Sequence, residues 1–503
     1  MPERFSRVVE KWAKKEPYRQ ALEFAGRRMT YGELWAATSD AVALLTRKGV
    51  RAGDRVVLVG ENGLQLVPLL LAVSELDAWS VPLNARMSGR EIEVIREFAE
   101  CRRAVYCIGD SSAAKQHAKA DRSAGETEEL LGPLVFSSLN EEVAAEQTFP
   151  EKERQTAVLV FTSGTTGEPK GVRLSHQALM YMGANMAELR QVTPDDVFYN
   201  SSPISHAIGL GTVLMTAFWA GAGVELVGKF TPQHFVEALQ AERITSVTAV
   251  PTLFARILDH AEKERLSLRS RRLRVIATAG APLDLALKTR VEAAFGLRMG
   301  NSYGMTECNP VARSATGVNT NEVGELQPGV EIRIVKEDGS DAGTDERGEL
   351  WARGPGLMLG YYRNDTATRA ALRDGGFMAT GDLATIDGQG RLYIVGRSKD
   401  LIIRSGFNVY PVEVESVLAL FPGVAQVAVV GRQIEGNEEI IAFVQPSPGD
   451  QLDVDAMSRW ASERLAPYKR PSEIIVRPEL PIGPTGKIFK TRLHEAAALK
   501  TFG

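Results

Sequence analysis

The sequence contains few cysteines and has no excess of charge of either sign. Among its 503 residues only Cys101, Cys107 and Cys308 are cysteines, and the net charge is −4. Sparse thiols in odd number favour a reduced cytoplasmic protein over a disulfide framework or a metal-ligand cluster. Balanced charge gives no general drive towards nucleic acid or an anionic membrane, so we expect neither as a partner. The first residues carry acid early and have no apolar core, so we expect no signal peptide.

Long hydrophobic runs are also scarce, and the one segment that approaches the length of a membrane span is diluted. Residues 207–224 carry no charge. Glycine and threonine interrupt their apolar side chains, and no positive flank sets an orientation. We therefore expect no integral membrane segment. The better interpretation is a buried helix that lines an apolar pocket.

The first four-fifths of the chain alternate strand-like and helix-like patterns. Such alternation indicates layered α/β structure with mostly parallel strands. Helix ends are marked as well: Ser175 and Thr231 are suited to cap helices, and Pro251 suits a first helical turn. Gly296 suits the end of a helix that starts at Pro282. We expect strands at 55–59, 157–161, 246–250 and 273–278, and helices at 64–75, 176–186, 232–241, 251–260 and 282–295.

The pattern changes near residue 330. Residues 331–335 and 348–352 are typical of antiparallel strands joined by turns. A compact α+β tail follows, with expected helices at 413–420 and 453–465 and expected strands at 424–430 and 440–444. The predicted fold class is therefore α/β. We expect a large N-terminal domain, 1–397, of layered α/β subdomains with a small antiparallel β part, and a small mobile α+β C-terminal domain, 398–503.

The most informative local pattern is a run of small hydroxyls and glycines with one lysine, directly after the apolar residues 157–161. Glycines let backbone N–H groups approach an anion closely, and hydroxyls and a lysine add donors and charge. The pattern predicts a phosphate-binding loop, with a flexible surface turn as the alternative. Its spacing is not that of a Walker A loop. The run contains Thr162, Ser163, Gly164, Thr165, Thr166, Gly167 and Lys170.

Further motifs follow this run in a fixed order. They are Tyr303-Gly304-Met305-Thr306-Glu307, Thr380-Gly381-Asp382, Gly396-Arg397-Ser398-Lys399-Asp400 and Pro484-Thr485-Gly486-Lys487. The series resembles the adenylate-forming superfamily, which includes acyl-CoA synthetases, adenylation domains and firefly-type luciferases. The resemblance covers almost the whole chain. It implies an AMP-forming acyl-CoA synthetase, an acid–thiol ligase that uses ATP, Mg²⁺ and CoA.

The resemblance implies two half-reactions. ATP and a carboxylate give acyl-AMP and pyrophosphate, and the thiol of CoA then attacks the mixed anhydride and releases AMP. In relatives the C-terminal domain rotates between the two steps. Lys399 occupies the family's hinge position, where a few residues absorb the change of backbone angles.

The ATP-binding residues implied by the resemblance also make chemical sense. Glu307 is suited to hold Mg²⁺ near phosphate oxygens, and Thr306 to hydrogen-bond the α-phosphate. Asp382 can accept both ribose hydroxyls, with Arg397 as a second ribose contact, and Tyr303 offers a flat face for adenine. The glycine-rich run would cradle the β- and γ-phosphates. The implied adenine and acyl-pocket segments add Gly280, Ala281, Pro282, Gly304 and Met305.

The resemblance assigns catalytic roles to Lys487 and His206. Lys487 would bridge the carboxylate and the α-phosphate, because an ammonium is a compact point charge suited to two associating anions. Taken alone, it would be an ordinary solvated lysine. His206 would border the carboxylate and the thiol channel, and a core histidine is the alternative. Ser205 stands where many relatives carry an aromatic residue, so the shape of the acid pocket is left open.

The CoA site is implied by scattered residues. Gly406 would enter the site in the second conformation and leave room for pantetheine. Tyr468 and Arg470 belong to a segment that resembles the one meeting the CoA nucleotide, and Arg86 would contact its phosphates. A homodimer is left open as a further assembly.

The acid is the least determined substrate. The uncharged residues 207–224 favour a medium or long-chain fatty acid, with space for its chain at Gly209 and Gly211. An aromatic acid is an alternative, and so is malonate, whose second carboxylate would pair with Arg256. A free-standing adenylation enzyme that loads a carrier protein is another alternative. Retention of Lys487 and Glu307 argues against a catalytically inactive scaffold.

Overall fold

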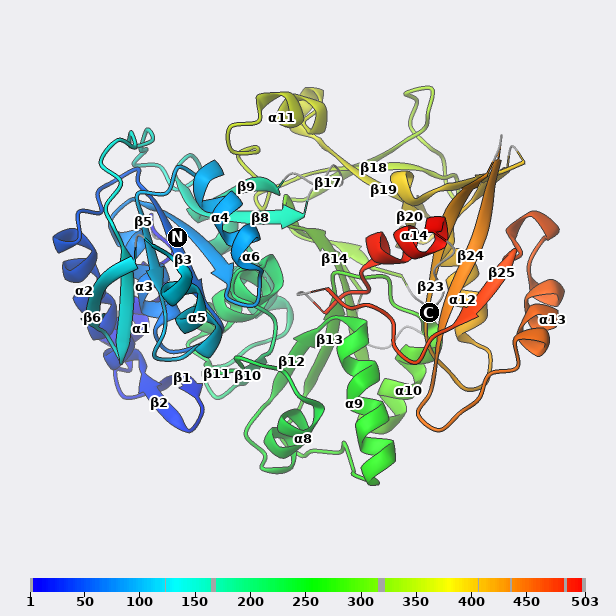
Figure 1. Cartoon of the computed structure of the whole chain (residues 1–503), viewed down its shortest axis with the longest axis horizontal. Coiled ribbons are helices and arrows are strands. Elements are labelled where there is room, and N and C mark those ends of the chain that lie inside the picture. The colour runs from blue at the N-terminus through cyan, green and yellow to red at the C-terminus, as the bar shows by residue number, and fades with distance from the viewer. Residues whose placement is uncertain are drawn as a thin grey trace.

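The chain folds into layered α/β sheets followed by a smaller α+β part, as seen in a computed structural model (Figure 1). The structure describes residues 3–122, 124–163, 169–314, 322–405, 407–434, 437–483 and 486–499. The predicted fold class is confirmed. Helices and antiparallel strands of the C-terminal part lie at one end of the molecule, beyond the two larger sheets (Figure 1).

The first large sheet lies in the N-terminal third, and its central strands are parallel. Every residue of β3 and β4 is buried, which explains their near-continuous apolar sequences. In spatial order the strands are β6 (Ala124–Glu129), β7 (Pro133–Ser137), β5 (Arg103–Tyr106), β3 (Arg55–Gly60), β4 (Trp79–Asn84), β8 (Thr156–Ser163) and β9 (Pro169–Ser175). Its helices are α2 (Tyr31–Arg47), α3 (Leu66–Glu75), α4 (Gly89–Phe98) and α5 (Ser112–Ala120).

The second large sheet carries the carboxyl-terminal strand ends around which ligands of open α/β sheets usually bind. Its strands β11, β10, β12, β13 and β14 run parallel to one another. In spatial order the strands are β16 (Glu325–Leu326), β15 (Cys308–Arg313), β14 (Met299–Met305), β13 (Val275–Ala279), β12 (Ser246–Ala249), β10 (Val197–Asn200), β11 (Gly223–Leu226), β1 (Gln20–Phe24) and β2 (Arg27–Thr30). Helix α1 (Arg7–Lys15) precedes β1.

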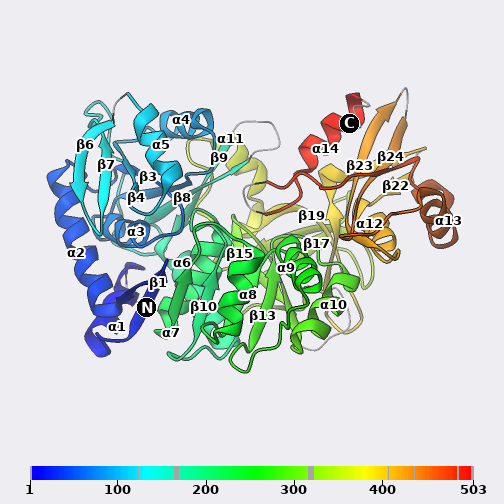
Figure 2. The same ribbon diagram turned by 60° about the horizontal axis from the view of Figure 1, so that its bottom comes forward.

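Helices cover both faces of this second sheet. On one face lie α8 (Pro232–Gln240), α9 (Pro251–Glu264) and α10 (Leu285–Phe295), which stand in front of the green strands in Figure 2. They bury a core of apolar side chains against alternate residues of β12, β13 and β14, including Val247, Ile276 and Met299. Helix α6 (His176–Leu189) and the π-helix η1 (Ile208–Met215) belong to the core on the other face.

Helix boundaries follow the caps that the sequence predicts, with one shift. The Ser175 and Thr231 hydroxyls accept hydrogen bonds from backbone N–H groups in the first turns of α6 and α8. Gly296 ends α10 with φ of 69°. The helix expected from Pro282 begins only at Leu285, because the carboxylate of Asp284 caps it.

The uncharged segment 207–224 is a buried helical segment, as predicted. It forms η1 and α7 (Thr216–Ala220) and then enters β11. Among the described residues, no helix is long and apolar enough to cross a membrane.

The space expected for an acyl chain at the two glycines of this segment is absent, so that expectation was wrong. A Cβ at Gly209 would lie 2.3 Å from the Pro203 carbonyl oxygen, and one at Gly211 would lie 2.3 Å from the Met182 sulfur. These glycines therefore permit close packing of η1 on its neighbours, and they are not the wall of a tunnel.

A small antiparallel sheet follows near residue 330, as predicted. It contains β17 (Glu331–Val335), β18 (Gly348–Arg353), β19 (Met378–Ile386) and β20 (Leu392–Arg397). Asp382, expected in a turn, lies within β19. The strand is irregular there because Gly381 has φ of 71° and the pairing with β18 shifts register. Helix α11 (Asp365–Ala371) and the short η2 (Asp374–Gly376) lie between β18 and β19.

The C-terminal part has cores of its own. Residues from 402 to 497 form two apolar clusters on either side of β23 and β24. The strands are β21 (Ile402–Arg404), β22 (Phe407–Val409), β23 (Val424–Ile434), β24 (Asn437–Pro446) and β25 (Glu473–Val476). The helices are η3 (Ser398–Asp400), α12 (Pro411–Ala419), α13 (Val454–Arg464), η4 (Pro467–Lys469) and α14 (Lys490–Leu499). The segment before α14 returns to the middle of the molecule (Figures 1 and 2).

Candidate active site

Lys487 lies at the carboxyl end of β13, next to Gly280 and Ile208, and the surroundings of these three residues are called the chamber below. A Cβ built on Gly280, the residue after β13, would lie 3.3 Å from Lys487 Cε and 3.5 Å from Lys487 Nζ. The same Cβ would lie 2.8 Å from Cδ1 of Ile208, at the start of η1. Gly280 has φ of 83°, a backbone conformation that glycine adopts without strain. Glycine at this position therefore lets a lysine from the C-terminal part reach the end of the central sheet.

The segment that carries Lys487 is fixed to the N-terminal part by a direct contact. The Thr252 hydroxyl, in the first turn of α9, donates a hydrogen bond to the Gly486 carbonyl. A Cβ on Gly486 would lie 3.0 Å from Val250 Cγ2, so the backbone approaches the end of β12 closely. The structure thus has the C-terminal part positioned with Lys487 inside the chamber.

Three residues expected around the adenosine meet directly. The Tyr303 hydroxyl, on β14, donates to Asp382 Oδ2 at 2.6 Å. Arg397 Nε, at the end of β20, lies 3.0 Å from Asp382 Oδ1. Burial, and then the Asp382 charge, raise the pKa of Tyr303 well above its ordinary value, so its hydroxyl remains a donor. Asp382 is 4% exposed, and its orientation is fixed from both sides.

Glu307 lies in the turn between β14 and β15 and is largely buried. Its Oε1 accepts a hydrogen bond of 2.9 Å from the Tyr361 hydroxyl. The Lys170 ammonium lies 5.2 Å from the centroid of the same tyrosine ring. Tyr361 therefore links the expected metal-binding carboxylate to the lysine of the glycine-rich run. Among the described residues, no cluster of three or more His, Cys, Asp or Glu side chains is arranged to hold a metal.

Burial and nearby charge set the protonation of the two expected catalytic groups. Burial, with the positive charge of Lys487 second, lowers the pKa of His206 to about 4. His206 is therefore a neutral imidazole near pH 7. Burial lowers the pKa of Lys487 as well, helped by the Arg397 charge and opposed by Asp382 and Glu307. The positive charge of Arg397 and the negative charges of Asp382 and Glu307 therefore all act on the Lys487 ammonium.

The glycine-rich run joins two antiparallel strands. Thr162 on β8 pairs with Lys170 on β9, and Ser163 pairs with Pro169. Lys170 therefore belongs to a strand, and no helix follows the run. The intervening Gly164, Thr165, Thr166 and Gly167 lie outside the described residues, as does Gly406.

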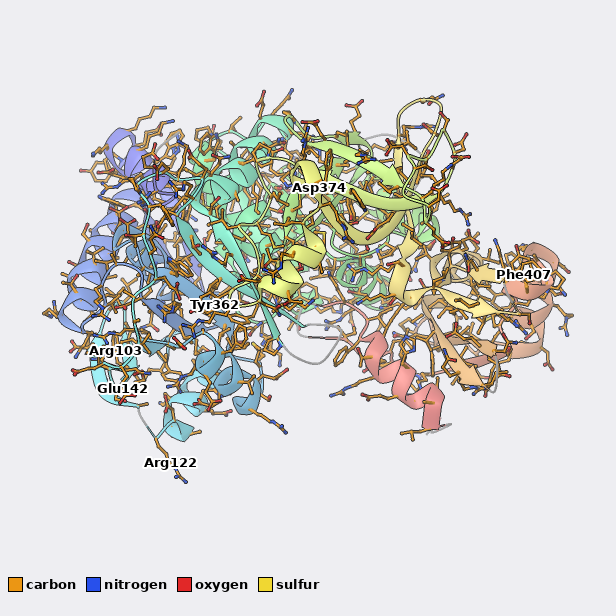
Figure 3. All side chains as sticks on the ribbon, turned by 90° about the horizontal axis from the view of Figure 1, so that it is seen from above. Arg103, Arg122, Glu142, Tyr362, Asp374 and Phe407 are labelled. Atoms are coloured by element: carbon orange, nitrogen blue, oxygen red, sulfur yellow. The ribbon has the colours of Figure 1, made fainter. Side chains whose placement is uncertain are left out.

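The residues expected to hold CoA are not brought together. The Tyr468 ring is stacked on Phe407, with ring centroids 4.6 Å apart. Phe407 lies at the outer end of the C-terminal part (Figure 3). Arg470 donates to the Leu465 and Ser462 carbonyls at the end of α13, so its guanidinium is occupied.

Arg86 lines a separate cavity of about 190 Å³ between the N-terminal part and the segment 482–486. Its guanidinium donates to Glu61 Oε1 at 2.8 Å and to the Gly228 carbonyl at 2.6 Å. Arg256, on α9, lines the same cavity and lies 5.3 Å from the centroid of the Phe230 ring. The cavity lies next to Gly486, so it borders the chamber that holds Lys487.

Comparison with known proteins decides the family. Residues 9–362 match the family described as AMP-binding enzyme, and residues 413–487 match the AMP-binding enzyme C-terminal domain. The chain belongs to the AMP-binding enzymes. The expected resemblance to acyl-CoA synthetases of the adenylate-forming superfamily is thereby confirmed.

Similar proteins match this chain along nearly its whole length. It is 32% identical over 509 residues to the indoleacetate–CoA ligase of Aromatoleum aromaticum, covering 99% of both chains. It is 32% identical over 486 residues to a feruloyl-CoA synthase of Amycolatopsis, covering 95% of this chain and 96% of that one. Among solved structures, ATP-bound MatB from Rhodopseudomonas palustris superposes with a TM-score of 0.83 at 28% identity, covering 99% of each chain.

Several residues of the chamber could not be found from the motifs. Tyr361 holds Glu307 from 54 positions further along the chain, and Thr252 holds the lysine segment from 234 positions away. Ile208 was included only as part of an apolar helix. Nothing in the local sequence pairs these residues, because tertiary folding alone brings them to the site.

Proposed function

We propose that the protein is an ATP-dependent ligase that activates an aromatic carboxylic acid as its acyl-adenylate and then transfers the acyl group to CoA. The observation that carries the proposal is the position of Lys487, beside Gly280 and close to His206, Asp382 and Arg397. A lysine held at the carboxyl ends of β12 and β13 is suited to bring a carboxylate and a phosphate together.

In the first step a carboxylate oxygen attacks the α-phosphorus of ATP and pyrophosphate leaves. The Lys487 ammonium would offset the negative charge that develops between the two anions. Asp382 would accept the ribose hydroxyls, because Tyr303 and Arg397 already fix its orientation. Thr162 and Lys170 would grip the leaving phosphates from the two strands of the hairpin.

The donor set around Glu307 fits Mg²⁺. Mg²⁺ in nucleotide sites takes one or two carboxylates together with phosphate oxygens, and Glu307 is a single buried carboxylate orientated by Tyr361. When bound, the ion would offset the charge of the phosphates. Thr306, next to Glu307, would hydrogen-bond the α-phosphate.

For the second step we propose a division into 1–397 and 398–503, with rotation about Lys399. Neutral His206 lies close to Lys487, and the preceding residue, Ser205, lines the cavity at Arg86. Pantetheine would enter there once the segment of Gly486 has left. The thiol sulfur then attacks the acyl carbon, the bond from that carbon to the AMP oxygen breaks, and the thiol proton goes to solvent.

An aromatic acid is better supported than the fatty acid that the sequence favoured. Two of the similar proteins named above are an indoleacetate–CoA ligase and a feruloyl-CoA synthase. In addition, the two glycines that were expected to make room for an acyl chain are filled by Pro203 and Met182. A short, flat acid avoids the need for a long tunnel.

The test is pyrophosphate release with a panel of indoleacetate, ferulate, octanoate and malonate, each with and without CoA. We expect an arylalkanoic or arylpropenoic acid to give the highest kcat/KM and sustained turnover to need CoA. A clear preference for octanoate would restore the fatty-acid alternative, and one for malonate would assign the cavity at Arg256 to the acid. Turnover with a carrier protein and none with CoA would overturn the ligase assignment.

A further inference from the structure

One face of the second large sheet carries small residues next to the Lys487 chamber. In the register of β12, β13 and β14, Thr248 pairs with Ala277, and Ala277 pairs with Gly300. Directly paired residues of parallel strands point to the same face, as do residues two apart on one strand. Ala279, one position before Gly280, therefore shares this face.

This face is the one that lies towards η1 and α6. The intervening residues Val247, Ile276 and Met299 point the other way, into the core under α8, α9 and α10. Phe198 on β10 pairs with Ser246, the residue two before Thr248, and belongs to the core that contains η1 and α6. A Cβ at Gly300 would make only ordinary contacts, 3.7 Å from Ala277 Cβ. The row beneath the chamber thus has unusually small side chains.

A buried arginine reaches the inner end of this row. Arg190 follows the last residue of α6 and is 8% exposed. Its Nη1 donates to Thr248 Oγ1 at 2.9 Å, whereas its buried Nη2 has no hydrogen-bond partner among the described residues. A buried guanidinium N–H without an acceptor destabilises the folded protein. Because its desolvation has already occurred, a hydrogen bond from it to a bound ligand would favour binding.

Further polar groups lie on the same face. On the antiparallel neighbour β15, Arg313 pairs with Ser302, which lies two positions after Gly300. The Ser302 hydroxyl is buried and, among the described residues, has no partner. Arg313 donates to the carbonyl of Leu189, the residue before Arg190. The two arginines therefore converge near the end of α6, whereas Ser302 pairs with Ala279 and lies nearer to Gly280.

No counter-charge accompanies these arginines in the described part of the chain. Its ion pairs include none from Arg190 or Arg313 to a carboxylate, and residues 315–321 contain neither Asp nor Glu. The neighbouring Arg274 is paired with Asp196. Burial, and then the charges of Arg313 and Arg274, lower the pKa of Arg190 to about 9, and burial lowers that of Arg313 to about 10.

Resting on the proposed function, we propose that Arg190, with Arg313, binds an anionic group at the far end of the acid substrate. Ala277 on β13 lies three residues before Gly280, a separation of roughly 10 Å along an extended chain. The substrate class is therefore a flat acid with a second carboxylate about one ring and a short side chain away from the reacting one. Arginine suits such a carboxylate because its planar fork of donors can bind both oxygens.

The experiment compares two para-substituted cinnamates that differ in charge at the far end, 4-carboxycinnamate and 4-methylcinnamate, by the kcat/KM of pyrophosphate release. We expect the wild-type enzyme to prefer 4-carboxycinnamate by roughly tenfold or more, since hydrogen bonds to charged groups are strong where water is excluded. Equal kcat/KM values, or a preference for the methyl compound, would overturn the inference without need of any variant.

The variant Arg190→Met should remove this preference by lowering kcat/KM for 4-carboxycinnamate alone. Arg313→Met should lower it in the same direction by a smaller factor, because part of its guanidinium is engaged by Leu189. Equal loss with both acids would mean that Arg190 only supports the fold, and would contradict the proposal. Arg290→Met, which removes an exposed ion pair on α10, is the matched control and should leave the ratio unchanged.

The two proposals fail in different ways. If wild-type enzyme releases pyrophosphate with neither cinnamate nor any other acid, the proposed ligase function fails. If it activates 4-methylcinnamate and cinnamate with the same kcat/KM as 4-carboxycinnamate, the result supports the ligase function and contradicts the anion site.

Discussion

Three of the residues expected to hold ATP contact one another, whereas the described residues expected to hold CoA are divided between the two parts of the chain. A hydrogen bond joins Tyr303 to Asp382, and an ion pair joins Asp382 to Arg397, next to Lys487. Arg86 lies in the N-terminal part, whereas Tyr468 is stacked on Phe407, which lies at the outer end of the C-terminal part (Figure 3). On the proposed function, this arrangement of the two parts would serve adenylation, and thioester formation would need a different one.

The largest expected effect comes from Lys487, because it is the group that the C-terminal part contributes to the residues expected around ATP. Lys487→Ala should lower acyl-adenylate formation by roughly 10²–10³-fold, the scale for removal of one preorganised charge-stabilising group. Conversion of presynthesised acyl-AMP and CoA to thioester should persist. Separate assays of the two half-reactions measure this, and equal loss in both would contradict the division of labour.

Asp382 should affect both half-reactions, since the AMP group is held throughout. Asp382→Asn removes the charge that faces Arg397 and weakens the acceptor for Tyr303. We expect roughly a ten- to hundredfold loss of kcat/KM for ATP, and a similar loss when acyl-AMP is supplied. Tyr303→Phe is the milder companion and should show a smaller loss. Normal conversion of acyl-AMP by Asp382→Asn would contradict a role for Asp382 in both half-reactions.

The sequence predicts the residues expected around ATP well and the lining of the acid site poorly, for a physical reason. Asp382, Arg397 and Lys487 each sit in a short motif whose order along the chain is characteristic, so their meeting could be expected. Gly209 and Gly211 were interpreted as open space because a sequence does not show which neighbour fills the place of a missing side chain. In the sequence, Arg190 is an ordinary arginine at the end of a helix. Only the folded structure shows that it donates a hydrogen bond to Thr248.

A substitution at Gly280 tests whether close backbone approach to Lys487 matters for adenylation more than for thioester formation. In Gly280→Ala the new methyl group would press on Ile208 and Lys487, on top of the strain of positive φ. We expect about a tenfold slower adenylation, a barrier change of about 1.4 kcal/mol, with thioester formation less affected. Gly390→Ala is the control, since φ there is 76° and no atom lies within 4 Å of the added methyl. Adenylation loss of the same size in both variants would show that backbone strain alone is responsible.

The smallest effect concerns pH. The pKa of His206 is about 4 in the folded protein, below the ordinary value of 6.5 that it recovers on unfolding. Between these values the unfolded state binds more protons, so this contribution to stability is complete above pH 6.5 and is lost as the pH falls towards 4. We expect His206→Gln to lose less Tm than the wild type between pH 7 and pH 5. Parallel Tm curves would contradict the buried, neutral state of His206.

The central claim is that this arrangement performs adenylation and must be left for thioester formation. Arg347 and Glu413 form an exposed ion pair between the small antiparallel sheet and α12, so cysteines at both positions can be joined by a cleavable bismaleimide. Cys107 and Cys308 are buried, and treated wild-type enzyme controls for Cys101. The measurement is the rate of each half-reaction in the cross-linked enzyme, before and after cleavage of the linker. The account predicts nearly normal acyl-adenylate formation in a single turnover and a thioester step that is lost and then restored by cleavage. Normal thioester formation in the cross-linked enzyme would contradict it.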